Sequence, residues 1–327
     1  MEKIKMEPMK SCNLCGSRSM KFLLRGKDKM YPIEKEYNLF QCKKCGLIFV
    51  NPQPSKKELL KHYPEKKYYS LNKSSKGGSE MKSILQRVYY SKQNYFLKIL
   101  LLLFKPFINS VKIIPGGRFL DVGCGSGELL SLMKEYNMEC YGLEPGKFDK
   151  ELAENKGTKI FNGNLEEANY LKEYFDVITM NHVLEHVENP TDTLKELKRI
   201  IKPDGTLIIG VPVSDCLAYS IFGESWIALD VPRHLYTYSK ETLVRYARKA
   251  DFKVEKIRYN SGPLQFAGSL LYFFGRHKKN QRYFSVMSNK RFLMVSLYIL
   301  CLPAAHLCNL FKIGDQIEIF LSQMKNE

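Results

Sequence analysis

The stretch FLDVGCGSGELL, residues 119–130, decides the fold because it joins an apolar strand to an amphipathic helix through a glycine-rich loop. Glycines at alternate positions let a ligand approach the backbone closely, as in nucleotide-binding loops. A dinucleotide fingerprint, G-x-G-x-x-G/A, needs a small residue where Glu128 stands. The carboxylates of Asp121 and Glu128 would repel a pyrophosphate. The loop therefore favours a ligand that has cationic groups and no phosphate.

The next predicted strand ends in a second acid, Glu144, which stands twenty-three residues after Asp121. A carboxylate at that place can accept hydrogen bonds from both hydroxyl groups of a ribose. S-adenosylmethionine has a ribose, an ammonium and a sulfonium but no phosphate, so it suits both acids and the glycine loop. We predict that it is the cofactor.

Strands alternate with helices from Arg118 onward. Predicted strands span residues 118–123, 139–145, 158–164, 174–183, 206–213 and 252–259, and a final one spans 317–322. Repeated units of this length are typical of a parallel sheet that helices cover on both faces. The expected fold class is α/β, a Rossmann-like doubly wound sheet that is mostly parallel with an antiparallel last strand.

Two C-x-x-C-G knuckles precede this region, formed by Cys12 and Cys15 and by Cys42 and Cys45. Each knuckle presents two thiolates on one tight turn, and two knuckles supply the four ligands of a closed tetrahedral zinc site. We therefore predict a structural Zn²⁺ in an N-terminal zinc ribbon. The alternative is that the four cysteines are buried separately.

The chain of 327 residues carries a formal net charge of +17, and most of the basic excess lies in its first 116 residues. Its ordinary apolar and charged contents exclude global disorder. Nine cysteines without an apolar signal-peptide segment suggest a reducing compartment, so we expect a cytoplasmic protein. The basic flanks are compatible with nucleic acid, an anionic membrane or an acidic substrate.

Several motifs together resemble one family. Residues 118–211 are similar to class I S-adenosylmethionine-dependent methyltransferases through DVGCGSG, GNLEE at 163–167, FDVITMNHVLEHVENP and LKRIIKPDGTLIIGVP. The whole chain resembles bacterial methyltransferases with an N-terminal zinc ribbon, which share C-x-x-C-G-L-x-F-x-N-P-x-P at 42–54 and W-x-x-L-D-x-P-R-H-L at 226–235. Such proteins often accompany cell-surface polysaccharide genes, and the resemblance implies a role of that type.

The resemblance and the binding of ligands at the carboxyl edge of open α/β sheets assign the cofactor-binding residues. They are Asp121, Gly123, Cys124, Gly125, Gly127, Glu144, Pro145, Asn164, Leu165, Asn181 and His182. Asn164 departs from the family pattern, in which an aspartate is more usual beside the adenine amino group.

Three residues, His186, Arg233 and His234, are candidates for the methyl-transfer chemistry. His182 and His186 are four residues apart and would share a helix face, so His186 is a candidate general base. Arg233 could clamp an acceptor carboxylate or phosphate, and His234 could take the acceptor's proton. The alternatives are that His186 only packs or caps the helix, and that Arg233 pairs with Asp230 in a structural lid.

The same segment does not predict a metal site. The order of His182, Glu185 and His186 differs from the zincin motif H-E-x-x-H, and the sequence shows no further ligand cluster beside them.

Two segments, residues 93–114 and 264–311, are apolar and have basic flanks. They help to decide whether the protein meets a membrane or nucleic acid. The stretch 292–311 is as long as a membrane span but contains Ser, Pro, His and Asn. A helix that lies in the interface of an anionic membrane suits this mixture better, which would place the protein peripherally on the inner face. The alternatives are a lid and a homodimer interface.

We divide the chain into a zinc ribbon (1–55), a basic helical linker (56–115), a methyltransferase core (116–260), an apolar helical insertion (261–312) and a last core strand with its tail (313–327). The predicted enzyme O-methylates a saccharide or glycan precursor that is nucleotide- or lipid-linked. One alternative is an RNA methyltransferase, although the chain lacks an N/D-P-P-[FY] motif and paired catalytic cysteines. The other is a non-catalytic cofactor-binding protein.

Overall fold

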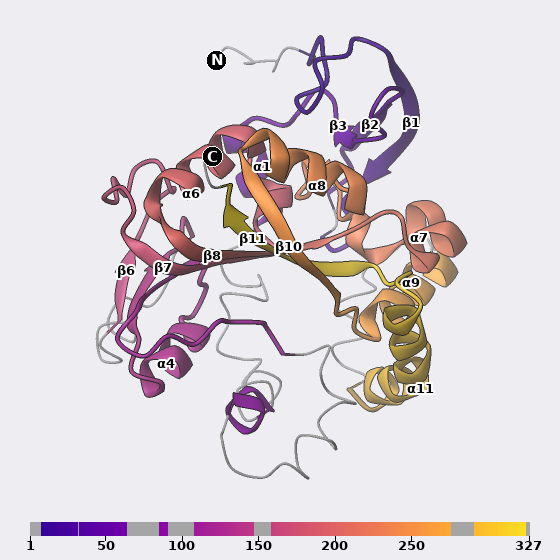
Figure 1. Ribbon diagram of the computed structural model, residues 1–327. Helices are drawn as coiled ribbons and strands as arrows, with labels where there is room; N and C mark the ends of the chain where they lie inside the picture. The colour runs from indigo at the N-terminus through magenta and orange to yellow at the C-terminus, as the bar shows by residue number, and fades with distance from the viewer. Residues whose placement is uncertain are drawn as a thin grey trace.

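The computed structural model describes residues 8–31, 33–63, 85–90, 108–146, 158–275 and 291–324. A seven-stranded sheet crosses the molecule (Figure 1), with the strand order β10-β11-β8-β7-β4-β5-β6. The five strands β8, β7, β4, β5 and β6 are parallel to one another, whereas β11 is antiparallel to both β8 and β10. The predicted Rossmann-like class and antiparallel last strand are confirmed.

Each predicted core strand is present. The strands are β4 (Arg118–Val122), β5 (Glu139–Leu143), β6 (Lys159–Phe161), β7 (Phe175–Asn181), β8 (Ile201–Pro212), β10 (Phe252–Tyr259) and β11 (Gln316–Gln323). The helices between them include α4 (Glu128–Glu135), α6 (Pro190–Ile200) and α8 (Lys240–Lys249). β8 begins earlier than predicted because Ile201 is already extended, with φ −80° and ψ 142°, and so ends α6.

Successive side chains of the central strands point to opposite faces of the sheet, so these strands contribute to two cores. Leu120 and Ile178 belong to the core that also contains residues of α6 and α8. Phe119 and Val177 pack with α4 on the other face. In Figure 1, α4 lies below the sheet, and α6 and α8 lie above it. The loops at the carboxyl ends of β4, β5, β7 and β8 therefore meet at one edge between these layers.

A second, antiparallel sheet has the order β1-β2-β3-β9. Its first three strands are N-terminal: β1 (Met20–Lys27), β2 (Glu36–Cys42) and β3 (Ile48–Val50). Its fourth strand, β9 (Tyr236–Thr237), follows the W-x-x-L-D-x-P-R-H-L block, and Tyr236 pairs with Phe49. The N-terminal sheet is thus completed by a segment from the predicted core. We did not predict β1, because its sequence lacks a strict alternation of apolar and polar residues.

The remaining helices are short or lie at the C-terminal side. They are α1 (Lys56–Leu59), η1 (Leu60–His62), η4 (Leu184–His186), α7 (Leu217–Phe222), η5 (Gly223–Ser225), η6 (Ile227–Leu229), α9 (Leu264–Gly275) and α11 (Arg291–Leu310). α9 contacts α7, η6 and α11, and Figure 1 shows α9 and α11 side by side.

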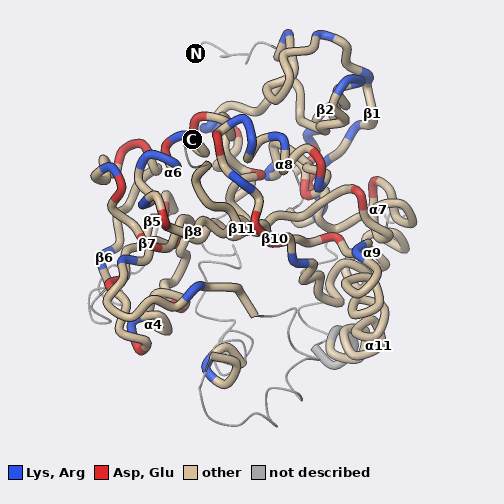
Figure 2. Tube along the Cα trace, viewed as in Figure 1, with Lys and Arg blue, Asp and Glu red and all other residues tan. Residues whose placement is uncertain are grey.

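The C-terminal helix α11 is apolar and partly uncovered. It has no Lys, Arg, Asp or Glu between residues 292 and 311, and the part of α11 that is coloured in Figure 2 shows no blue or red. Ile299, Leu300 and Leu310 are exposed on it. Within the described ranges, none of the helices combines the length and the hydropathy needed to cross a bilayer.

Some predicted elements lie outside the described residues. They are residues 64–84 and 91–107 of the linker, which include most of its apolar segment 93–114, the helix predicted at 147–157, and residues 276–290 of the insertion.

Candidate functional site

The glycine loop between β4 and α4 is held over the end of β5. The backbone N–H groups of Gly123 and Cys124 both donate to the carbonyl of Leu143, at 2.7 and 3.1 Å. Gly123 has φ +75°, and a Cβ on it would lie 2.3 Å from Cγ2 of Val183. Position 123 therefore requires glycine because Val183, rather than a ligand, approaches it closely. Gly127 ends the loop as the N-cap of α4.

Two carboxylates flank this loop. Glu144 accepts hydrogen bonds from the backbone N–H groups of Gly125 and Gly146, both at 2.9 Å, one on each oxygen. Asp121 is buried, and its Oδ1 accepts from Oγ1 of Thr179 at 2.6 Å. A carboxylate oxygen has two lone pairs, so Glu144 retains capacity for the hydroxyl groups of a ribose.

Asn181 and His182 follow β7 at the same edge of the sheet. The Nδ2 atom of Asn181 is buried and has no hydrogen-bond partner among the described residues. A buried amide without a partner costs free energy that a bound acceptor would remove. The side chain of His182 is 48% exposed, and its backbone is left-handed, with φ +54°.

Four other predicted cofactor-binding residues differ in which of their groups could contact a ligand. The side chains of Cys124 and Leu165 are buried in the two cores, so only their backbone can face a ligand. Pro145 is exposed. The backbone N–H and Nδ2 of Asn164 donate to the carboxylate of Glu167, at 2.8 and 3.4 Å, so these two donors already have a partner, and an adenine amino group would need the acceptor Oδ1.

This edge fits S-adenosylmethionine better than a dinucleotide. Glu144 and Asp121 place two acids beside the glycine loop, and the Asn181 amide lacks an acceptor. The acids suit a ligand with an ammonium, a sulfonium and ribose hydroxyls, whereas they would repel a pyrophosphate.

Replacing Gly123 with alanine is expected to weaken the binding of S-adenosylmethionine by about 30-fold or more, since it adds left-handed strain and displaces Val183. Calorimetric titration with S-adenosylmethionine measures the effect. Gly116→Ala is the matched control, because Gly116 also has positive φ but a Cβ there meets no atom within 4 Å. Equal binding losses in both variants would contradict the role of the Val183 contact.

The segment after β7 is a single 3₁₀ turn, η4, rather than the predicted helix. His182 has positive φ, and Val187 is extended. The carbonyl of Glu185, which a longer helix would use internally, instead accepts from the backbone N–H of Leu235 at 2.8 Å. The prediction that His182 and His186 share a helix face is therefore wrong.

His186 is held against the block that contains Arg233. Its Nδ1 lies 2.9 Å from the carbonyl oxygen of Arg233 and 3.1 Å from the hydroxyl of Tyr63. Burial lowers the pKa of His186, and the neighbouring His234 lowers it further, to about 4. His186 is therefore a neutral imidazole at pH 7. Tyr63 was not among the predicted site residues, and nothing in its local sequence singles it out.

Glu185 and His234 complete this cluster. The rings of His186 and His234 meet edge to face, with centroids 4.8 Å apart, and Nδ1 of His234 lies 2.8 Å from the carbonyl of Ala228. The carboxylate of Glu185 is fully buried, and neither oxygen has a hydrogen-bond partner among the described residues. Burial raises the pKa of Glu185, but the imidazoles of His182, His186 and His234 outweigh burial and lower it to about 2.

Arg233 is not positioned as the predicted acceptor clamp. Its guanidinium is fully buried and forms ion pairs with Asp28, at 2.7 Å, and with Asp230. The remaining N–H of Nη1 donates to the carbonyl of His62 at 3.1 Å. All five N–H groups are thus used within the chain. The ion pair with Asp230 agrees with the alternative prediction, in which Arg233 has a structural role. Asp28 is a second partner that the sequence did not predict.

Trp226, which contacts Asp315, provides a fluorescent probe of the W-x-x-L-D-x-P-R-H-L block. The Oδ2 atom of Asp315 accepts from Nε1 of Trp226, the only tryptophan in the chain, at 3.1 Å. Burial raises the pKa of Asp315 from 3.8 to about 6. A folded pKa above the unfolded value means that Asp315 contributes stability below pH 3.8 that is lost as the pH rises through about 6.

We expect the fluorescence of Trp226 to change with a midpoint near pH 6 as Asp315 ionises. A fluorescence titration of the folded protein measures this midpoint. The transition should be absent in Asp315→Asn, and a transition of the same midpoint in that variant would contradict the assignment.

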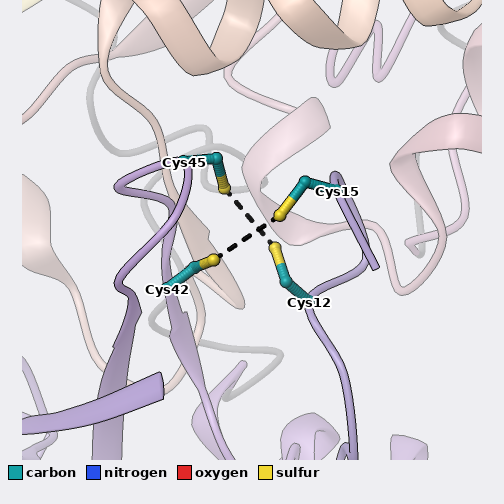
Figure 3. A group of neighbouring side chains, drawn as sticks. All are labelled: Cys12, Cys15, Cys42 and Cys45. Carbon is teal, nitrogen blue, oxygen red and sulfur yellow. Dashed lines mark hydrogen bonds between the residues drawn. The ribbon is translucent and has the colours of Figure 1, made fainter. Parts of the chain in front are cut away.

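The four knuckle cysteines converge at the N-terminal sheet (Figure 3). The Sγ atoms of Cys12 and Cys45, and those of Cys15 and Cys42, are each 3.6 Å apart, and none of the four forms a disulfide. Four thiolates around a tetrahedral zinc ion lie about 3.8 Å from one another, since the Zn–S distance is about 2.3 Å. The cluster therefore has the geometry of a four-thiolate metal site.

Comparison with known proteins agrees with the geometry of the cofactor edge. A family described as "Methyltransferase domain" matches residues 91–257, just over half of the chain. The ubiquinone biosynthesis O-methyltransferase of Glaesserella parasuis is 28% identical over 167 residues, which are 46% of this chain and 71% of that protein. Its mitochondrial counterpart from Schizosaccharomyces pombe is 29% identical over 157 residues, or 44% and 57% of the two chains.

One solved structure aligns over most of both chains. It is a 1,6-didemethyltoxoflavin-N1-methyltransferase from Burkholderia thailandensis, with a TM-score of 0.48, 12% identity and coverage of 90% of this chain and 98% of that one. The alignments to the two O-methyltransferases span 57–71% of their lengths. The family match, the glycine loop and the acid that ends β5 lead to one conclusion. The chain belongs to the class I S-adenosylmethionine-dependent methyltransferases, enzymes that transfer a methyl group from that cofactor to an acceptor.

Proposed function

We propose that this protein O-methylates a saccharide or glycan precursor, either nucleotide-linked or lipid-linked. The observation that carries the proposal is the pair His186 and His234 at the cofactor edge. Each imidazole has its Nδ1 against a backbone carbonyl, which leaves Nε2 as the basic atom. A hydroxyl acceptor needs such a base, because its proton must leave as the oxygen is methylated.

The chain's residues divide the reaction between binding and proton transfer. When bound, S-adenosylmethionine supplies an electrophilic methyl group on a sulfonium. The carboxylate of Glu144 and the amide of Asn181 would hold the cofactor at the ends of β5 and β7. Nε2 of His234 or His186 would accept the acceptor's proton. The tie between Leu235 and Glu185 keeps the two imidazoles beside the cofactor edge.

The acceptor class rests on two supports. The resemblance to methyltransferases that accompany polysaccharide genes favours a sugar hydroxyl. The relatives named as ubiquinone biosynthesis O-methyltransferases also favour an oxygen acceptor, and they make a quinone precursor the second compound to test.

The test uses the purified full-length protein, methyl-labelled S-adenosylmethionine and a fractionated bacterial lysate. Label is counted separately in lipid-linked glycan, soluble sugar, quinone and RNA pools. Label in a glycan or sugar pool supports the proposal. Label in the quinone pool alone keeps O-methylation but replaces the acceptor, and label in RNA alone overturns the proposal. Cofactor binding without label in any pool favours a non-catalytic cofactor-binding protein.

We also propose that α11 touches an anionic membrane, as the apolar segment 264–311 predicted. Its support is the exposure of Ile299, Leu300 and Leu310 on the helix and of Phe311 directly after it, with Lys312 next in the sequence. The full-length protein should sediment with phosphatidylglycerol vesicles, and Leu300→Glu should reduce this at least several-fold. Lys195→Glu, an exposed change on α6, is the control. Equal retention of the Leu300→Glu variant would leave a dimer interface or a lid as the role of α11.

A further inference from the structure

Three side chains from two distant segments of the sequence converge next to the cofactor edge. Glu185 and His186 come from η4, and His234 comes from the block before β9. One ligand atom from each residue lies within 4.8 Å of the others. The oxygen Oε1 of Glu185 is 3.8 Å from Nε2 of His234. The set consists of two imidazoles and one carboxylate.

The hydrogen bonds of the two imidazoles determine which nitrogen is available. A carbonyl oxygen cannot donate, so Nδ1 of His186 must carry the hydrogen in its contact with Arg233. The same holds for Nδ1 of His234 and the carbonyl of Ala228. Nε2 is therefore the nitrogen of each imidazole that is left to bind a metal ion. Histidines that bind metal ions typically use the other ring N–H in this way, to fix the tautomer and the ring orientation.

The carboxylate of Glu185 is the second, independent observation. It is fully buried, and neither oxygen accepts a hydrogen bond from the described residues. A buried carboxylate without hydrogen bonds or a counter-charge is strongly destabilising, so such groups are normally paired or coordinate a metal. His182 has its Nδ1 3.4 Å from Oε1 and is the rival partner of this carboxylate.

The surroundings hold the three groups in place. The backbone N–H of Leu235 donates to the carbonyl of Glu185, and the hydroxyl of Tyr238 donates to the carbonyl of Leu184 at 3.0 Å. The carbonyl that orients His186 belongs to Arg233, whose side chain is buried between Asp28 and Asp230. The buried ion pairs thus fix the backbone that orients one of the imidazoles.

We propose that Glu185, His186 and His234 bind a divalent first-row transition-metal ion between manganese and zinc. Two imidazoles favour these ions over magnesium and calcium, which prefer oxygen ligands alone. Three protein ligands leave coordination positions open, as in catalytic rather than structural sites. Ligand atoms around a tetrahedral ion lie roughly 3.4 Å apart at metal–ligand distances of about 2.1 Å. The three side chains therefore draw together when the ion binds.

The site deepens the proposed function and rests on it for the acceptor, but it replaces the imidazole base with the ion, because an Nε2 lone pair that binds a metal cannot also accept a proton. An open coordination position beside the glycine loop suits an acceptor hydroxyl, because a bound cation lowers the pKa of that hydroxyl and promotes release of its proton to solvent. The substrate class that follows is an acceptor whose oxygen can bind the ion, such as a sugar with adjacent hydroxyl groups.

The test is a titration of the purified full-length protein with Mn²⁺, in which electron paramagnetic resonance measures the free ion. Thiolates prefer softer ions, so Mn²⁺ does not report on the four-cysteine cluster. We expect one Mn²⁺ per chain, and affinities at least about 100-fold weaker in Glu185→Gln and in His234→Gln. Glu188→Gln and His306→Gln are the matched controls, and both should bind as the wild type does. Equal binding by the wild type and both site variants, or no stoichiometric binding, overturns the proposal.

Thermal unfolding separates metal binding from a structural role of the carboxylate. Without Mn²⁺, the melting temperatures of the wild type and of Glu185→Gln are the reference values, because the variant also changes the contacts of the carboxylate with His182 and His234. With Mn²⁺, the melting temperature of the wild type should rise and that of Glu185→Gln should not. If His182 is the partner of the carboxylate instead, His182→Gln destabilises the metal-free protein and Mn²⁺ has no effect, which overturns the proposal.

Failure of the metal site and failure of the proposed function give different results. Cofactor affinity and methyl transfer are measured in parallel on the same preparations. Methyl transfer that does not depend on Mn²⁺ or Zn²⁺ would contradict the role proposed for the metal site and support the proposed function. Stoichiometric Mn²⁺ binding without methyl transfer to any oxygen acceptor would support the metal site and contradict the proposed function.

Discussion

Arg233→Met is expected to lower the free energy of unfolding by about 3–5 kcal/mol, because it removes the guanidinium that pairs with the carboxylates of Asp28 and Asp230. Asp28 is fully buried and Asp230 is 17% exposed, and both pair with the guanidinium; Asp28 also contacts Nδ1 of His62 at 2.6 Å, which would remain in the variant. Chemical denaturation followed by circular dichroism measures the change. The affinity for S-adenosylmethionine should change far less, since no described contact joins Arg233 to the glycine loop.

The matched control is Arg245→Met. Arg245 pairs with Glu241 on the surface of α8, at 44% and 68% exposure, so its loss should cost less than about 0.5 kcal/mol. A second check replaces all three members, as Asp28→Asn, Asp230→Asn and Arg233→Met together, and should recover part of the lost stability. A single variant that keeps its stability but loses affinity for the acceptor would instead support the acceptor clamp predicted from the sequence.

Cys12→Ala is expected to abolish zinc binding at the four-cysteine cluster and to lower the free energy of unfolding by about 4 kcal/mol or more. This follows from our proposal that Cys12, Cys15, Cys42 and Cys45 hold a structural zinc ion. Zinc binding supplies about 10–16 kcal/mol in small structural sites, and that energy stabilises the folded state. The zinc ligands border β2 and β3, so the loss should also disturb the pairing of β3 with β9.

Elemental analysis of the purified protein and thermal unfolding measure both effects. Cys140→Ala is the control, because Cys140 is equally buried but lies in β5, away from the cluster. It should retain one zinc per chain in the four-cysteine cluster. A Cys12→Ala variant that melts at the wild-type temperature would show that the four cysteines are merely buried together.

The sequence predicted the features that depend on local pattern. Alternating strands and helices predicted the sheet, and the acid at the end of β5 was correctly located as Glu144. The final strand was predicted within one residue at each end. The paired C-x-x-C-G knuckles predicted that four cysteines would meet. These predictions succeeded because each depends on a short motif or on hydrophobic periodicity, which neighbouring residues largely determine.

Contacts between distant segments could not be predicted in this way. The helix expected to carry His182 and His186 is a short turn, because Leu235 takes the carbonyl of Glu185. Arg233 is buried because Asp28, about two hundred residues earlier, meets it in the fold. The sequence argument found no metal site around Glu185, because His234 stands nearly fifty residues away and only the fold brings it there.

The sequence by itself determined the fold class, the cofactor loop and the cysteine cluster, because glycine conformation, apolar periodicity and ligand spacing are local properties. Only the tertiary structure decided the roles of the W-x-x-L-D-x-P-R-H-L block. There β9 completes the N-terminal sheet, Arg233 is neutralised by two carboxylates, and His234 joins Glu185 and His186. The physical reason is that burial and charge pairing depend on which segments meet, and a single chain's local pattern does not contain that information.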